Sequence, residues 1–221
     1  MLIDLTIPLS DGMKMLGSFP AVEIKKFFSF DDNSGKYEYP CTGCQAESLS
    51  LVVHTGTHAD SPRHFIRDGL DMENISLEKY MGEAVLIDLT ERDDSVTITR
   101  EQMETAIKKA GGCKKNNILL LHTTKRKWNE EGYLTIAGIS EEAAEYIVEL
   151  GIKAVGVSGM AIDTLSDKRR PAHMCLLRNS VVIIEGLINL EKVRGPRCQF
   201  IALPLKICNA GGSPVRAICI E

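Results

Sequence analysis

A short stretch of the chain, residues 54–64, concentrates side chains that can bind metals. It contains three of the protein's five histidines and one aspartate, in the order His54, His58, Asp60 and His64. This mixture of imidazole nitrogen and carboxylate oxygen suits Zn, Mn, Fe or Co better than Ca or Mg. On an α-helix, His54 and His58 would share a face, but Asp60 would lie about 200° round from His58. On a strand, the four side chains would spread over roughly 33 Å.

Only a loop that folds back on itself can bring these side chains to one ion. Gly56 and Pro62 permit such turns, and the strand-like run 48–53 leads into the segment. The alternative is a polar loop with solvated histidines, which fits a single histidine better than three at ligand spacing. We therefore predict a metal-binding loop.

Two further donors, His173 and Glu185, lie in the C-terminal part of the chain. Glu185 ends an apolar run, where an unpaired carboxylate would be costly to bury. Arg178 or Lys192 could pair with it, whereas a metal ion would engage both Glu185 and His173. Together with the loop this makes five ligands, which exceeds one four-coordinate catalytic site and suits two ions bridged by carboxylates.

His64 is not part of this set of five ligands. It could be a further ligand, or it could be the acid/base of a reaction, because a neutral imidazole near pH 7 is suited to proton transfer.

The bulk composition restricts the class of protein. A chain of 221 residues can bury a sizeable core as one domain, 1–221, and its net charge of −4 argues against binding to nucleic acid or to an anionic membrane. The N-terminus has no basic region followed by a long apolar run, so neither a signal peptide nor a membrane span is expected. Seven cysteines, an odd number without a framework spacing, favour a reducing cytoplasm.

Hydrophobic periodicity and capping signals predict an α/β fold with a mixed sheet. Strands are expected at 48–53, 85–89, 118–123, 153–158, 180–185, 200–205 and 215–220. A capping box at 99–102 opens a helix that stops at Gly111, and Ser140 caps a second helix that ends at Gly151. Residues 10–47 show weak periodicity, and we expect an irregular segment that covers the site.

Three weaker signals favour ordinary roles. The Cys41–Cys44 pair lacks a partner pair at zinc-finger spacing, so loop cysteines are preferred to a metal or redox site. His122 ends an apolar run and is favoured as a satisfied core or edge histidine over a sixth ligand. The glycine-rich segment 209–214 is expected to be a turn that borders the pocket.

The candidate metal ligands and the segments around them, taken in order, resemble the cyclase family of metal-dependent hydrolases, which includes bacterial kynurenine formamidases and isatin hydrolases. The loop motif His-x-Gly-Thr-His-x-Asp-x-Pro-x-His-Phe is matched throughout residues 54–65. The likeness continues through 68–70, 77–89, 137–159, 171–177, 183–190 and 201–218, and so covers nearly the whole chain.

The resemblance implies a role for each candidate residue. His54, His58 and Asp60 would bind one Zn or Mn ion, and Asp60 would bridge to a second. His173 and Glu185 would complete the pair, although some relatives hold a single ion, and His64 would be the catalytic proton donor or acceptor. The implied fold is a swivelling β/β/α arrangement, usually paired into homodimers.

The implied reaction is hydrolysis of a small amide, formamide or lactam by metal-activated water. A lactone hydrolase or a lyase on the same ions, and a non-catalytic metal-binding module, are the alternatives. Kynurenine formamidases carry a Trp that stacks on the substrate near the N-terminus. Met15 falls at about that place here, and Phe19 is the nearest aromatic, so both are candidate substrate-binding residues. Ser158 also replaces an Asp that is usual in relatives.

Overall fold

The computed structural model describes residues 1–16, 18–33 and 35–221 of the chain. Its strands are β1 (Leu2–Asp4), β2 (Glu23–Phe28), β3 (Ala46–Ser50), β4 (His58–Asp60), β5 (Met81–Asp88), β6 (Ile118–His122), β7 (Ala154–Val157), β8 (Val182–Glu185), β9 (Arg197–Ile201), β10 (Gly212–Pro214) and β11 (Ile218–Ile220). The α-helices are α1 (Arg100–Lys109), α2 (Glu141–Glu149) and α3 (Pro171–Arg178). Short 3-10 turns lie at 31–33, 62–64, 72–74, 77–80, 133–135 and 190–192.

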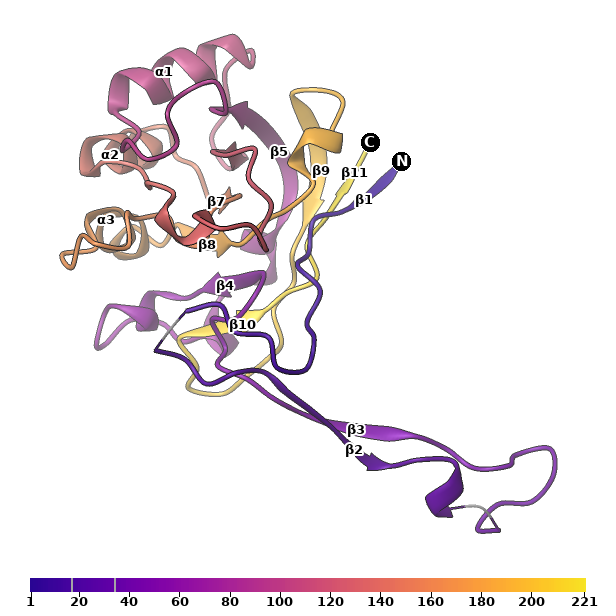
Figure 1. Cartoon of the computed structure of the whole chain (residues 1–221). Coiled ribbons are helices and arrows are strands. Elements are labelled where there is room, and N and C mark those ends of the chain that lie inside the picture. Colours follow the sequence, from indigo (N-terminus) through magenta and orange to yellow (C-terminus); the bar gives the residue numbers. More distant parts are fainter. Residues whose placement is uncertain (17, 34) are drawn as a thin grey trace.

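Nine of these strands form one mixed sheet within the described residues, in the order β1-β11-β9-β5-β6-β7-β8-β4-β10. The four central strands β5, β6, β7 and β8 run parallel, and the flanking pairs are antiparallel. The helices connect successive parallel strands and lie together on one face of the sheet (Figure 1). The predicted α/β fold with a mixed sheet is confirmed.

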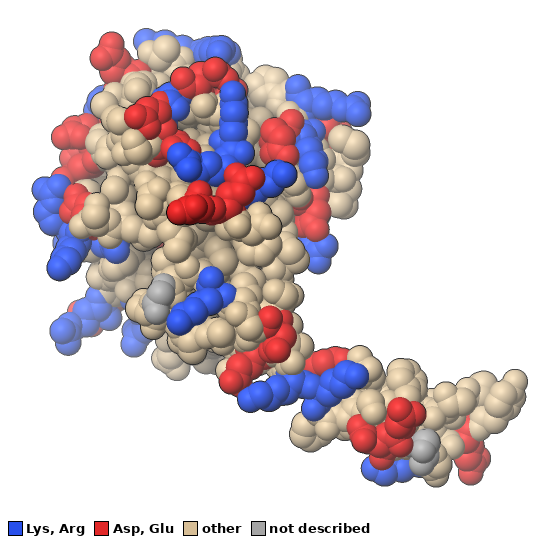
Figure 2. Space-filling view, in the orientation of Figure 1, with Lys and Arg blue, Asp and Glu red and all other residues tan. Residues whose placement is uncertain are grey.

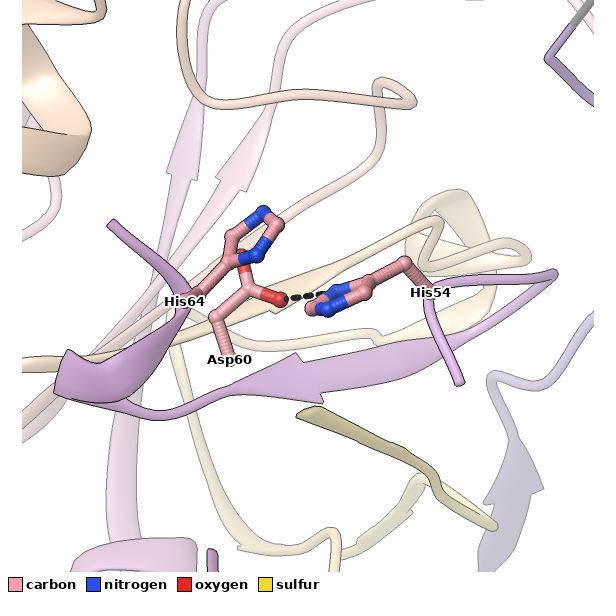
Figure 3. Close-up of side chains that lie close together, drawn as sticks. All are labelled: His54, Asp60 and His64. Atoms are coloured by element: carbon pink, nitrogen blue, oxygen red, sulfur yellow. Dashed lines mark hydrogen bonds and ion pairs between the residues drawn. The ribbon is translucent and has the colours of Figure 1, made fainter. Parts of the chain in front are cut away.

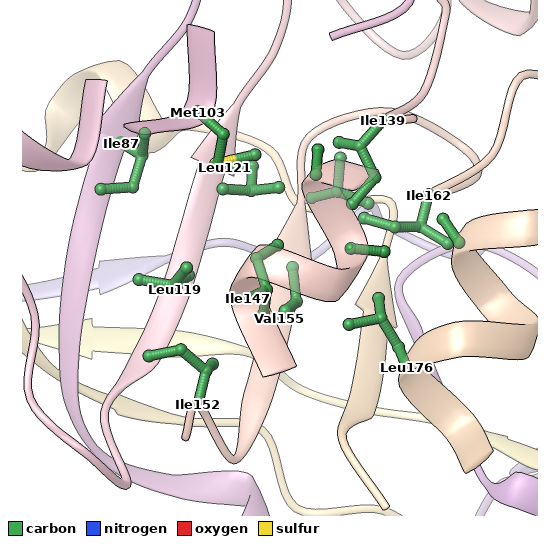
Figure 4. Close-up of a cluster of buried hydrophobic side chains, with 14 of the residues drawn as sticks. Ile87, Met103, Leu119, Leu121, Ile139, Ile147, Ile152, Val155, Ile162 and Leu176 are labelled. Carbon is green, nitrogen blue, oxygen red and sulfur yellow. The ribbon is translucent and has the colours of Figure 1, made fainter. Parts of the chain in front are cut away.

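The helical face of the sheet carries the largest apolar core (Figure 4). The capping box at Thr99 and Gln102 forms as predicted, and Ser140 accepts a hydrogen bond from the Ala143 N–H to cap α2. These caps satisfy backbone donors at the first turns, so both helices can present apolar residues to the sheet. The buried residues of this layer include Ile87, Leu119, Leu121, Met103 and Ile147.

The opposite face of the sheet curls over a second apolar cluster, which includes Tyr80, Leu120 and Phe200. Beyond β1 the chain makes an isolated bridge from Thr6 to Leu187, directly after β8. The chain that follows β1, at one edge of the sheet, therefore meets the chain that follows β8, the seventh strand of nine, so the sheet curls over this cluster while the helices cover its other face. This arrangement fits the β/β/α layout implied by the family resemblance.

Strands β2 and β3 form a separate two-stranded ribbon that projects from the body (Figure 1, Figure 2). We call residues 23–50 the arm. The expectation of an irregular segment at 10–47 is wrong for residues 23–28 and 46–47, which are strand; positions 17 and 34 lie outside the described residues. Most residues of the ribbon are exposed on both faces, so the burial pattern that reveals a strand in a sequence is weak here.

The predicted strands of the parallel sheet agree with the structure to within a few residues, whereas those near the ends of the chain are displaced. The run 48–53 belongs to β3 of the arm and ends at Ser50, and 200–205 becomes β9 at 197–201. Only the last part of 215–220 is strand. No helix in the described residues is long and apolar enough to cross a membrane.

Candidate metal centre

The centre of the site is the pairing of β4 with β8. His58 and Asp60 are alternate residues of β4, so their side chains project from the same face of the sheet. The antiparallel register places His58 opposite Glu185, the last residue of β8. His173 comes from the first turn of α3, which covers this face. Two segments far apart in sequence thus contribute to one cluster.

These four side chains converge at contact distance. His58 Nε2 lies 3.5 Å from Asp60 Oδ1 and 3.5 Å from Glu185 Oε2. His173 Nε2 lies 3.3 Å from Asp60 Oδ2 and 3.2 Å from Glu185 Oε1. All four residues are buried. Glu185 has no need of Arg178 or Lys192, because its carboxylate faces both imidazoles and accepts a hydrogen bond from a backbone N–H at 2.6 Å.

His54 and His64 approach Asp60 from the two ends of β4 (Figure 3). His54 Nδ1 lies 2.7 Å from Asp60 Oδ1, and the rings of His54 and His64 stack with their centroids 3.8 Å apart. The potential ligand atoms form two groups, His54 with Asp60 and His64, and His58 with Asp60 and Glu185; within each group they lie within 4.8 Å of one another. Asp60 belongs to both groups, as a bridging carboxylate would.

The predicted loop is partly a strand. His58 and Asp60 lie in β4, while His54 precedes it in a turn and His64 lies in the 3-10 turn after it. The turning residue Gly56 has a φ of 68°, in the left-handed region that glycine adopts without strain. The prediction that the chain must fold back is correct, but a short strand in a sheet provides half of the donors.

Hydrogen bonds orient two of the imidazoles toward the carboxylates. His58 Nδ1 lies 3.0 Å from the carbonyl oxygen of Gly56, and His173 Nδ1 lies 2.6 Å from Asp163 Oδ2. When each Nδ1–H donates to its oxygen, each Nε2 is left facing Asp60 and Glu185. Histidines that bind metals commonly have this arrangement, with the second ring nitrogen donating to a carbonyl or carboxylate.

A buried oxygen of Asp60 indicates that the donor set fits a cation. Among the described residues, Asp60 Oδ2 has no hydrogen-bond partner, although His173 Nε2 lies 3.3 Å away. An unsatisfied buried carboxylate oxygen costs free energy that coordination of a metal ion would recover. Because the neighbouring donors are nitrogen and oxygen, the set suits a divalent transition metal or zinc.

The clustered carboxylates and imidazoles shift the pKa values of one another. Burial disfavours a charged His58, but its contact with Glu185 and the charges of Asp60 and Glu185 outweigh burial and raise its pKa to about 9. The pKa of His173 is likewise raised, against burial, chiefly by the charge of Glu185. Burial alone would raise the pKa of Glu185, yet the charge of His173 lowers it to about 2. Burial likewise opposes ionisation of Asp60, but its contacts with His173 and His54 lower its pKa, so both carboxylates remain ionised.

His64 differs from these two histidines. Burial lowers its pKa to about 4, with repulsion from His54 and His173 acting in the same direction and only Asp60 and Glu185 opposing it. His64 is consequently a neutral imidazole at neutral pH. This is the protonation state that a group needs to accept a proton during catalysis.

Glycines of segment 209–214 pack against the histidines. Gly212 pairs with Asp60 across β10 and β4, and a Cβ built on Gly212 would overlap the His54 ring, 2.8 Å from its Nδ1. A Cβ on Gly211 would lie 3.1 Å from the Cα of His64. The segment is thus more than the expected turn, because its missing side chains make room for His54 and His64.

Comparison with known proteins identifies the family. Residues 3–164 match the model of the Cyclase family, described as "Putative cyclase". The protein belongs to the Cyclase family. The kynurenine formamidase of Bacillus cereus is 33% identical to it over 170 residues, 77% of each chain. The kynurenine formamidase of Bacillus cytotoxicus is 31% identical over 192 residues, which cover 85% of this chain and 88% of that protein.

Solved structures agree with this assignment to the Cyclase family. Isatin hydrolase A from Labrenzia aggregata superposes with a TM-score of 0.85 at 24% identity, covering 99% of this chain and 93% of that one, and it shares the fold. A potential metal-dependent hydrolase with cyclase activity superposes with a TM-score of 0.79 at 26% identity, covering 99% and 96%. The family resemblance predicted from the loop motif is confirmed.

The N-terminal candidates Met15 and Phe19 differ in their surroundings. Met15 is buried in a third apolar cluster with Met13 and Tyr133, and it lines a cavity of about 460 Å³. Phe19 is half-buried. An aromatic ring that contacts the cluster is that of Phe65, whose centroid lies 4.8 Å from that of His173.

Sequence reasoning did not single out Phe65 as a substrate residue, although its place directly after His64 was an available signal. Phe65 is partly exposed, so its ring can contact both the cluster and a ligand. Sequence reasoning also missed Asp163, which no motif marks. Both residues act at the cluster through contacts that only the folded chain reveals.

Other expected features of this Cyclase-family protein have ordinary surroundings. Ser158 is buried and its hydroxyl accepts a hydrogen bond from the Thr123 N–H at 2.9 Å, which ties the ends of β6 and β7 together. His122 lines a different cavity, of about 510 Å³. Cys41 and Cys44 lie in the arm.

Proposed function

We propose that this protein hydrolyses the C–N bond of a small amide, formamide or lactam at the centre formed by β4, β8 and α3. The observation that carries the proposal is the convergence of His54, His58, His173 and Glu185 on the buried carboxylate of Asp60, whose Oδ2 has no hydrogen-bond partner among the described residues. The relatives named kynurenine formamidase support a substrate of this class.

These five residues would hold one or two divalent cations, Zn or Mn, with Asp60 as the bridge between two sites. A cation held there would supply Lewis-acid chemistry, acidifying water and polarising the substrate carbonyl. The negative charges of Asp60 and Glu185 match the positive charge of the ion, and the imidazoles complete the ligand set without adding charge.

His64 is proposed as the catalytic acid/base. As a neutral imidazole beside Asp60 it accepts the proton that the attacking water loses, and then returns it to the leaving nitrogen. The stacked His54 ring holds one face of the His64 imidazole, while Phe65 lies beside it with ring centroids 4.1 Å apart. We propose Phe65 as a platform for a flat substrate, with Met15 and Phe19 as further candidates.

The experiment that tests this function combines metal analysis with turnover. Protein purified without chelator should contain Zn or Mn, and it should hydrolyse at least one aryl formamide or lactam. His64→Ala should lower turnover by roughly 10²–10⁴-fold while metal content is retained. His122→Ala, a histidine outside the centre, is the matched control and should leave turnover unchanged.

Three results would count against the proposal. Loss of metal together with activity in His64→Ala would make His64 a ligand. Absence of metal from active protein would remove the metal centre from the reaction. Failure to incorporate oxygen from ¹⁸O-labelled water into the product would favour a lyase.

We also propose that the protein forms a homodimer in which the arm packs on a second copy of the chain. An isolated two-stranded ribbon is marginally stable in water, so it needs a surface to cover it. The arm exposes four large aromatic side chains, Phe27, Phe30, Tyr37 and Tyr39. Exposed apolar groups of this kind mark association surfaces, and two-fold exchange of equivalent arms is a closed arrangement.

The oligomeric state tests this proposal directly. Light scattering after size-exclusion chromatography should give twice the chain mass of 24.4 kDa. A single-chain mass across micromolar concentrations would overturn it.

The cysteines of the described residues are all free, which supports placing the protein in a reducing compartment such as the cytoplasm.

A further inference from the structure

Asp163 is a buried carboxylate outside the set of proposed ligands. It lies in the connection between β7 and α3 and is 1% exposed. Its Oδ1 accepts a hydrogen bond from the Ala172 N–H at 2.8 Å, and its Oδ2 accepts one from the His173 N–H at 3.1 Å. The same Oδ2 lies 2.6 Å from His173 Nδ1. One carboxylate thus contacts both the backbone and the ring of a candidate ligand.

The two backbone contacts fix the position of α3. The residue at the helix N-cap, Arg170, has left-handed backbone angles and provides no side-chain cap. Asp163 takes over this function from outside the helix, because it satisfies two backbone N–H groups of the first turn. Helices α1 and α2 use their own local caps, Thr99 and Ser140. A distant residue therefore sets where α3 begins.

The ring contact fixes the orientation of His173. When Nδ1–H donates to Asp163, the lone pair of Nε2 is directed to the opposite side of the ring. On that side lie Asp60 Oδ2 at 3.3 Å and Glu185 Oε1 at 3.2 Å. No Lys or Arg in the part of the chain that the structure describes forms an ion pair with Asp163, so His173 is its charge partner.

We propose that Asp163 is a positioning residue for the metal centre, which holds His173 in the orientation and tautomer that direct Nε2 to the cation. This inference rests on the proposed function, since it requires an ion bound by His173. Carboxylates that accept from the second nitrogen of a ligand histidine raise its basicity and restrict its rotation. Asp163 does this while anchoring the helix that carries the histidine.

The test measures Co²⁺ binding to metal-free protein, by competition with a chelator and by visible absorption, which reports ligand geometry. In Asp163→Asn the side chain keeps its shape, but its NH₂ group faces one of the donors that the carboxylate satisfied. We expect Co²⁺ affinity to fall roughly 10–100-fold and the absorption bands to shift.

Ser140→Ala is the matched control, because it removes a helix cap on the same face of the sheet without touching the centre. It should lower the thermal unfolding midpoint of the metal-free protein and leave Co²⁺ affinity within about twofold, because the Ser140 hydroxyl accepts from the Ala143 N–H and shares no hydrogen-bond partner with Asp163 or His173. If Asp163→Asn does not fold, Asp163→Ser is measured in its place with the same expectation, since the shorter side chain cannot reach the ring.

The outcomes separate the two proposals. If the wild-type protein binds Co²⁺ but Asp163→Asn binds it within twofold as well, the positioning role is wrong and the proposed function stands. If Ser140→Ala weakens binding as much as Asp163→Asn, Asp163 acts only on general stability. If the wild-type protein binds neither Co²⁺, Zn²⁺ nor Mn²⁺, the proposed function itself fails.

Discussion

The metal centre and the arm differ in how deeply their residues are buried. At the centre, charged and imidazole groups are buried on a short strand, and each position is constrained by several neighbours. In the arm, a longer pair of strands is exposed at most of its residues, and four large aromatic side chains of the arm are exposed. Both regions are built from strands, so the type of secondary structure does not decide how strongly a residue is held in place. The number of neighbours packed around the residue decides it.

The strongest test of this contrast removes one charge from the centre. Asp60→Asn should lose bound metal and reduce turnover to background, because the negative charge shared by both donor groups holds the cations close. Metal analysis and turnover are measured together. Asp93→Asn, an exposed aspartate, should retain both. Retention of two ions in Asp60→Asn would contradict the bridging role.

The dependence of metal binding on pH should be nearly as large an effect as the loss of metal in Asp60→Asn. His58 has a pKa of about 9 in the ion-free protein, so it carries a proton at pH 7 that a cation must displace. Binding should therefore strengthen as pH rises, about tenfold per unit for this one proton, and level off above pH 9. Calorimetry in buffers of different ionisation enthalpy would count the released protons, and no release at pH 7 would contradict it.

A single methyl group added at Gly212 should weaken metal binding less than the loss of the Asp60 charge does. In Gly212→Ala the new Cβ meets the His54 ring, so the imidazole must move. We expect about 10–100-fold weaker metal binding, similar to the loss of a residue that orients a ligand. Gly195→Ala is the matched control, because its nearest neighbour lies 3.9 Å from the built Cβ. Equal affinities in the two variants would show that the ring adapts.

The arm should tolerate substitution with the smallest effect on folding. Phe27→Ser with Tyr39→Ser should change the free energy of unfolding of one chain by less than about 0.5 kcal/mol, because both side chains are exposed. The same variant should shift a dimer toward single chains in light scattering. Val96→Ser, an exposed apolar residue of the body, serves as control. A large loss of stability without a change in mass would show that the arm packs on its own body.

The same contrast explains what the sequence could predict. The convergence of the side chains of residues 54–64 was predictable, because few arrangements bring their nitrogen and oxygen donors close together. Capping signals at Thr99 and Ser140 located two helices, because local hydrogen bonds determine where a helix begins. Apolar runs located the parallel strands, since these are buried on both faces.

The remaining features depend on contacts between distant residues. No local pattern announces that Asp163 would bind the first turn of α3, or that Gly212 would face His54. Helix α3 itself was not predicted, because its N-terminus is capped by a residue outside the helix. The arm lacks a buried face, and periodicity therefore could not reveal β2.

The antiparallel pairing of β4 with β8 has one further consequence. It joins an early segment of the chain to the edge of a parallel sheet that forms from later residues, by three residue pairs. An ion held between Asp60 and Glu185 would act as a cross-link at this seam, and closing so long a loop restricts the unfolded chain more than the folded one. The cation would thus stabilise the pairing of β4 with β8, and this stabilisation would increase with the concentration of the cation.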